Sequence, residues 1–92
     1  MSRPAPASLA QAEIGDALHV LSVSAPGHAP EWERWLEEIG FLPGEPVSVM
    51  ARVPGGDPLV VRIGTSTFAL RRAEAECVRV ERQPQPDQAL AA

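Results

Sequence analysis

The chain has 92 residues, enough for one domain with a single modest core but not for a deep catalytic cavity with its own lid. Lys and Arg together number 8 against 12 Asp and Glu, giving a formal net charge of −4. This balance argues against nucleic acid as the main partner, because such binding rests on clustered basic side chains at phosphates.

The cysteine content and the distribution of apolar residues indicate the compartment of the protein. The single Cys77 excludes an internal disulfide and suits a reducing compartment. No apolar run approaches the roughly 20 residues that span a bilayer, and the first residues lack the apolar centre of a signal peptide. We therefore expect a cytoplasmic protein without direct membrane insertion.

The start of the chain predicts a short helical turn and then a strand. Residues 1–7 are rich in proline and small residues and are expected to be disordered. Ser8 is a candidate cap for a helical turn over 8–12. A strand is expected over 17–23, and its core-facing positions do not alternate strictly, which requires an irregularity; these positions are Leu18, Val20 and Val23.

A helix is predicted over 30–39. Pro30 suits the first helical turn, and Glu31 and Glu33 complement the positive end of the helix dipole. Four apolar residues at i, i+3, i+4 and i+7 form one stripe that should face the core; they are Trp32, Trp35, Leu36 and Ile39. Both tryptophans are therefore expected to lie mainly in the core.

The stretch that follows predicts a helix stop, a tight turn and a strand. Gly40 suits a left-handed helix cap, and the sequence 42–45, with proline second and glycine third, is typical of a type II turn. Alternation over 47–53 predicts a strand with one buried face. The inward residues would be Val47, Val49, Ala51 and Val53, and the outward ones Ser48, Met50 and Arg52.

The second half of the chain predicts three more strands. Residues 54–58 are a turn before a strand over 59–63, and a further strand is expected over 67–70. A helical turn over 72–75 precedes the last strand, 77–80, in which Val78 and Val80 should face in and Cys77 and Arg79 out. Five short strands with one inserted helix predict a mainly β fold, a small closed barrel.

Three blocks of sequence resemble the ferrous iron transport protein A (FeoA) family. They are Leu36-Glu37-Glu38-Ile39-Gly40-Phe41-Leu42-Pro43-Gly44, then Gly56-Asp57-Pro58, then Phe68-Ala69-Leu70-Arg71-Arg72-Ala73-Glu74-Ala75. The resemblance implies an SH3-like barrel over 8–82, leaving 83–92 as a disordered tail. It also implies a small cytoplasmic accessory protein of bacterial ferrous iron uptake. Such a protein acts by contact with FeoB, a membrane permease with a cytoplasmic GTP-binding domain.

Partner-binding residues are predicted near the turn and on the outer strand faces. Phe41, Leu42, Met50 and Val60 are a candidate apolar patch, although scattered exposed apolar residues are ordinary. Arginines predominate in residues 58–82, and Arg71 is the best single candidate for an acidic partner. The alternative is a solvated barrel exterior with Arg62, Arg71 and Arg79 on it.

A metal site is the other binding hypothesis. His28 and Glu31 are three residues apart, and His19 and Cys77 could add ligands from strands, so Fe(II) or Zn is a candidate ion. A site needs three or four converging ligands, and this spacing secures only a pair. Solvated polar side chains are the simpler interpretation, and no cofactor is required.

A second function and the oligomeric state stay open. FeoA-like barrels also form the C-terminal domains of iron-dependent repressors, so a metal-responsive regulatory module is the alternative to an uptake accessory. No Ser–His or Cys–His pairing and no phosphate-binding glycine loop is evident, and therefore we expect no enzyme. The sequence also leaves homo-oligomerisation open.

Overall fold

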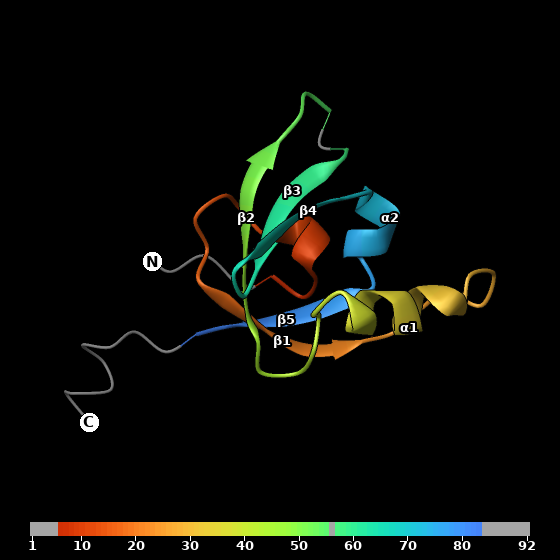
Figure 1. Cartoon of the computed structure of the whole chain (residues 1–92). Helices are drawn as coiled ribbons and strands as arrows, with labels where there is room; N and C mark the ends of the chain where they lie inside the picture. Colours follow the sequence, from red (N-terminus) through yellow and green to blue (C-terminus); the bar gives the residue numbers. More distant parts are fainter. Residues whose placement is uncertain (1–5, 56, 84–92) are drawn as a thin grey trace.

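A computed structural model describes residues 6–55 and 57–83 (Figure 1). The elements in chain order are η1 (Leu9–Gln11), β1 (Leu18–Val23), α1 (Glu31–Glu38), β2 (Pro46–Arg52), β3 (Leu59–Ile63), β4 (Ser66–Leu70), α2 (Arg72–Ala75) and β5 (Val78–Arg82). The predicted disorder at the two ends of the chain falls mostly outside the described residues. Neither helix of the described chain is long and apolar enough to cross a membrane.

All five strands belong to one antiparallel sheet in the order β4-β3-β2-β1-β5. The sheet bends sharply where β1 meets β2, because these strands pair only at Leu18 with Val47 and His19 with Pro46. Figure 1 shows the β1–β5 pair crossing beneath the upright strands β2, β3 and β4. The described residues form no ladder between β4 and β5, so the barrel stays partly open there.

The core lies inside this bend and is almost entirely aliphatic. Its fully buried larger side chains are Leu9, Leu18, Val20, Leu36, Phe41, Val49, Leu59, Val61, Leu70 and Val78. The 3-10 helix η1 closes one end and α1 packs on β1. Ser8 stands at the N-cap of η1 as predicted, but its hydroxyl makes no capping hydrogen bond.

The predicted irregularity in β1 is confirmed. The register against β5 shifts between Val20 and Ser22, which turns Val23 back toward the core. In β3, which covers the predicted strand 59–63, the alternate residues Leu59, Val61 and Ile63 are all buried.

The predicted alternation of β2 is wrong after Val49. The register against β3 shifts between Val49 and Ala51, so Met50 is an extra residue and the later side chains change faces. Ala51 and Val53 are therefore exposed, although they were predicted to be buried. Arg52 turns inward instead, and its guanidinium donates hydrogen bonds to the carbonyls at the end of η1, those of Ala10 and Ala12.

The apolar stripe of α1 is only partly covered. Leu36 is fully buried and Trp32 and Ile39 are half-buried, as predicted. Trp35, however, keeps 39% of its surface exposed, so its predicted place in the core is wrong. The helix has eight residues and packs on β1. This packing covers the centre of the stripe, at Leu36, and leaves the edge with Trp35 open.

Two glycines hold the turn between α1 and β2. Gly40 has a φ of +121° and ends the helix, and Gly44 has a φ of +90° at the third position of the predicted type II turn. The Glu45 N–H donates to the Leu42 carbonyl across that turn at 3.0 Å. Both predictions for these glycines are confirmed.

Candidate functional site

The start of α2 fixes the predicted partner-binding residue Arg71. The Arg72 N–H donates to the Asp57 carboxylate at 3.0 Å, and the Arg71 N–H donates to the Glu74 carboxylate at 2.8 Å. These bonds satisfy N–H groups that the helix cannot satisfy internally. The Arg71 side chain is left exposed beside a small hollow that Asp57, Pro58 and Ala69 also line.

The turn after α1 exposes only one of its two candidate apolar residues. Leu42 is 46% exposed and so is accessible to a partner, and its role as a contact residue stays a prediction. Phe41 is fully buried, so its predicted exposure to a partner is wrong. The Phe41 N–H donates to the Leu36 carbonyl at 2.9 Å, and the ring belongs to the core beneath α1.

Met50 lies in an apolar groove that the sequence did not predict. It is 47% exposed at the β2 bulge. The same groove is lined by Ile14, which is 60% exposed and pairs with Val49 through an isolated bridge. No local pattern marks Ile14, because it stands alone between Glu13 and Gly15. Val60, the other candidate of the predicted patch, is half-buried.

The exposed candidates do not form one continuous patch. In Figure 1 the yellow-green turn that carries Leu42 lies at the bottom of the molecule, and the start of α2, with Arg71, lies at the upper right. Met50 lies on β2, the strand that rises from the turn at the bottom of the view. The structure therefore offers separate contact surfaces.

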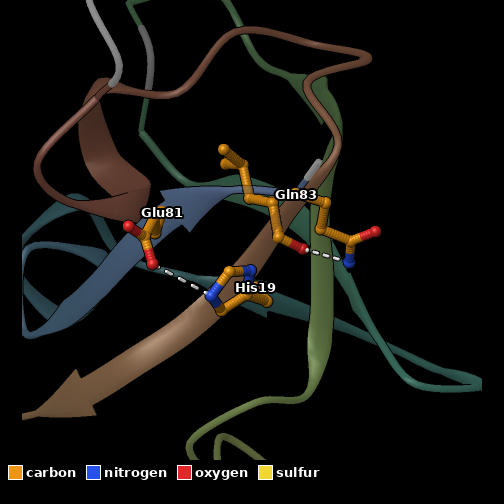
Figure 2. A network of polar contacts seen from close by, with 4 residues as sticks. His19, Glu81 and Gln83 are labelled. Atoms are coloured by element: carbon orange, nitrogen blue, oxygen red, sulfur yellow. Dashed lines mark hydrogen bonds and ion pairs between the residues drawn. The ribbon is translucent and has the colours of Figure 1, made fainter. Parts of the chain in front are cut away.

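The predicted metal ligand His19 already has a partner. Its Nε2 atom lies 3.2 Å from the Glu81 carboxylate, across the β1–β5 pair (Figure 2). Beside it, the Gln83 side chain donates from Nε2 to the Leu18 carbonyl at 2.9 Å. These contacts tie the end of β5 to β1.

The other candidate ligands are dispersed. His28 is exposed and its ring stands at 76° to that of Trp32, with the ring centroids 6.0 Å apart. Glu31 is exposed at the first residue of α1. The structure contains, in the part of the chain it describes, no group of three or more His, Cys, Asp and Glu side chains that could hold a metal ion. One molecule therefore supplies at most a pair of ligands from these residues.

Cys77 is buried, and its predicted exposure on the last strand is wrong. It ends the α2 segment, one residue before β5, and its thiol donates to the Ala73 carbonyl with Sγ and O 3.4 Å apart. Burial raises the pKa of the Cys77 thiol, and the nearby Glu76 and Glu74 carboxylates raise it further. A thiol held protonated in this way is a poor nucleophile and a poor metal ligand.

Comparison with known proteins gives a family. The family model described as FeoA domain matches residues 7–82. The FeoA of Stenotrophomonas maltophilia, solved in complex with zinc and described as an SH3 domain protein, is 36% identical, with 83% of this chain and 91% of that chain covered and a TM-score of 0.75. The FeoA of Chlorobium tepidum is 30% identical, with 84% of this chain and 70% of that chain covered and a TM-score of 0.71.

A manganese-dependent transcriptional repressor shares the fold. It is 23% identical, and 90% of this chain matches 44% of that chain with a TM-score of 0.72. No relative was found among curated protein sequences. The family model spans most of the chain and the Stenotrophomonas protein matches nearly end to end, so the chain, with its mainly β, SH3-like fold, belongs to the FeoA family.

Proposed function

We propose that this chain is a cytoplasmic accessory protein of bacterial ferrous iron uptake that acts by contact with a FeoB-type permease and its GTP-binding domain. The observation that carries this proposal is the FeoA domain over residues 7–82. The FeoA family is linked to ferrous iron transport and is not a known enzyme family. The similar Stenotrophomonas protein has been suggested as a ferrous iron transport activating factor.

The exposed surfaces of the structure suit a role in protein contact. Among the described residues, Ser24, His28 and Cys77 line one hollow, but no hydrogen bond joins His28 to either of the other two, and the Cys77 thiol donates to the Ala73 carbonyl instead. Exposed Leu42 and Arg71 have instead the chemistry of an apolar anchor and a charged contact. Because one lies in the turn before β2 and the other at the start of α2, which Figure 1 shows apart, each represents its own candidate contact face.

The test is restoration of ferrous iron uptake in cells that lack their own copy of this protein. Leu42→Glu places a charge in an apolar contact, and Arg71→Glu reverses the sign at a charged one. A residue at the centre of an interface contributes about 2 kcal/mol or more, so either change should weaken the contact about thirtyfold or more. Uptake should fall accordingly while circular dichroism stays that of the folded protein.

Two matched variants control for the added charge. Val53→Glu changes another exposed apolar residue, and Arg79→Glu changes another exposed arginine, on β5. Both should restore uptake as wild type does. Full restoration by folded Leu42→Glu and Arg71→Glu would exclude both predicted faces. Failure of the wild-type chain itself to restore uptake would contradict the proposed function.

A metal-responsive regulatory module is the competing function. The repressor that shares the fold is under 25% identical and is less than half covered by this chain, so the likeness concerns the fold alone. No observation on the described residues favours the repressor role over iron uptake.

A further inference from the structure

The outer side of α1 carries a shallow groove in which both tryptophans of the chain take part. Its lining residues are Glu31, Trp32, Arg34, Trp35, Glu38 and Glu74. Five of them come from α1 and one from α2, which stands above α1 on the same side of the molecule in Figure 1. The groove is therefore built by two elements and not by one helix face alone.

The two tryptophans give this groove an apolar surface. Trp35 exposes 39% of its area even though the neighbouring Leu36 is fully buried. Neither indole N–H has a hydrogen-bond partner among residues 6–55 and 57–83. Exposed tryptophans with a free N–H are typical of interface centres, where the ring gives contact area and the N–H gives direction.

The rim of the groove is negative. Three carboxylates and one guanidinium line it, and Arg34 is already paired with Glu38 at 3.5 Å. Glu74 accepts the Arg71 N–H, whereas Glu31 has no ion pair within the described chain. A cation that enters the groove would meet Glu31 and Glu74 next to the face of an exposed indole.

We propose that this groove binds a segment of a partner protein in which an arginine or lysine stands beside an apolar residue. The apolar residue packs on Trp32 and Trp35, and the cation lies over an indole face within reach of Glu31 and Glu74. The proposal rests on the proposed function and extends it, because it assigns the chemistry of one partner segment. Charge complementarity selects this occupant over an acidic or purely apolar one.

The intrinsic tryptophan fluorescence of the full chain tests the proposal directly, because both tryptophans line the groove. The probe is a synthetic amphipathic helix with a leucine stripe and arginines on its polar face. Its control has the same leucines with glutamates in place of the arginines. The arginine peptide should give a saturable change in emission that weakens as salt is raised, and the glutamate peptide should give none.

Two pairs of variants locate the binding on the groove. Glu31→Gln removes a rim carboxylate and should weaken binding about two- to fivefold, the range of one exposed ion pair. Glu33→Gln removes a carboxylate of the same helix that does not line the groove, and should change nothing. By calorimetry, Trp35→Ala should weaken binding at least tenfold, whereas Trp35→Phe should keep most of it.

Three results would overturn the proposal. The first is equal affinity for the arginine and glutamate peptides. The second is an equal effect of Glu31→Gln and Glu33→Gln on the arginine peptide. The third is self-association of the protein in sedimentation that is abolished by Trp35→Ala, since the occupant would then be a second copy of this chain.

Uptake assays separate this inference from the proposed function. If wild type restores ferrous iron uptake, Glu31→Arg should lose it and Glu33→Arg should keep it, both with unchanged circular dichroism. Restoration by wild type and by Glu31→Arg would overturn the inference and leave the proposed function standing. Failure of wild type to restore uptake would refute the proposed function. The peptide titration would then test by itself whether the groove binds a cationic, apolar segment.

Discussion

At the scale of single residues, two acids of the sequence blocks stabilise the start of α2. Asp57 and Glu74 belong to different blocks, and each accepts a backbone N–H there, from Arg72 and Arg71 respectively. Neither residue was predicted to have this role. The contact of Asp57 is hidden by its distance in sequence from residue 72, and that of Glu74 because Arg71 is not a residue type that marks the start of a helix. Both acids therefore act as helix caps, a role that requires no bound ligand.

Removal of the Asp57 cap should measurably destabilise the protein. Asp57→Ala leaves the Arg72 N–H without its acceptor and should cost about 1 kcal/mol, the usual value for a lost cap. Asp57→Asn keeps an acceptor oxygen and should cost less. The measurement is the free energy of unfolding in urea for the three proteins. An unfolding midpoint for Asp57→Ala equal to that of wild type would contradict the capping role.

At the scale of elements, the turn between α1 and β2 depends on backbone conformation alone. A Cβ atom at Gly44 would meet no atom within 4 Å, yet the φ of +90° is one that other residues rarely adopt. The turn is also tied to β1, because the Gly44 N–H donates to the Val20 carbonyl at 2.7 Å. A residue with a Cβ atom at position 44 would therefore strain a turn that is hydrogen-bonded to β1.

Gly44→Ala should destabilise the domain by about 1 kcal/mol or more through that φ. Gly27→Ala is the matched control, since Gly27 also has open space around it but lacks a positive φ. It should be neutral or slightly stabilising, because alanine restricts the unfolded chain. Thermal denaturation of both variants compares them, and equal melting temperatures would show that the conformation at Gly44 carries no strain.

The elements also show why some strand faces could be predicted and others could not. In β1 the apolar residues themselves break the alternation, so the register shift was visible in the sequence. In β2 the apolar residues continue through Ala51 and Val53 in the unbroken register, and the shift at Met50 left no trace. The inward turn of Arg52 is decided by carbonyls of η1, about 40 residues earlier.

At the scale of the whole molecule, the bend of the sheet decides which candidate residues meet. Leu42 and Arg71 belong to blocks that stand apart in the sequence, and the turn before β2 and the start of α2 that carry them also lie apart in Figure 1. The same bend brings Glu74 of α2 to the edge of the groove on α1. The sequence predicted most of the elements, but the composition of a surface built by two elements depends on tertiary packing.

Metal binding is also a property of the whole molecule. Zinc in proteins takes four ligands, and one molecule supplies at most a pair from the described His, Cys, Asp and Glu residues. His19 is engaged by Glu81, whereas His28 and Glu31 are exposed near the start of α1. If these two residues bind a metal ion tightly, a second molecule has to complete the coordination.

If His28 and Glu31 do bind zinc, micromolar zinc should raise the sedimentation coefficient of the protein in analytical ultracentrifugation as two molecules join, and a chelator should reverse the change. His28→Ala should abolish the dimer by removing a ligand, whereas His19→Ala should retain it. Tight zinc binding by a protein that stays monomeric would show that the ligands converge within one chain, against the geometry described. If calorimetry shows no heat with zinc or ferrous iron and the melting temperature is unchanged, His28 and Glu31 are ordinary solvated side chains and the metal hypothesis is wrong.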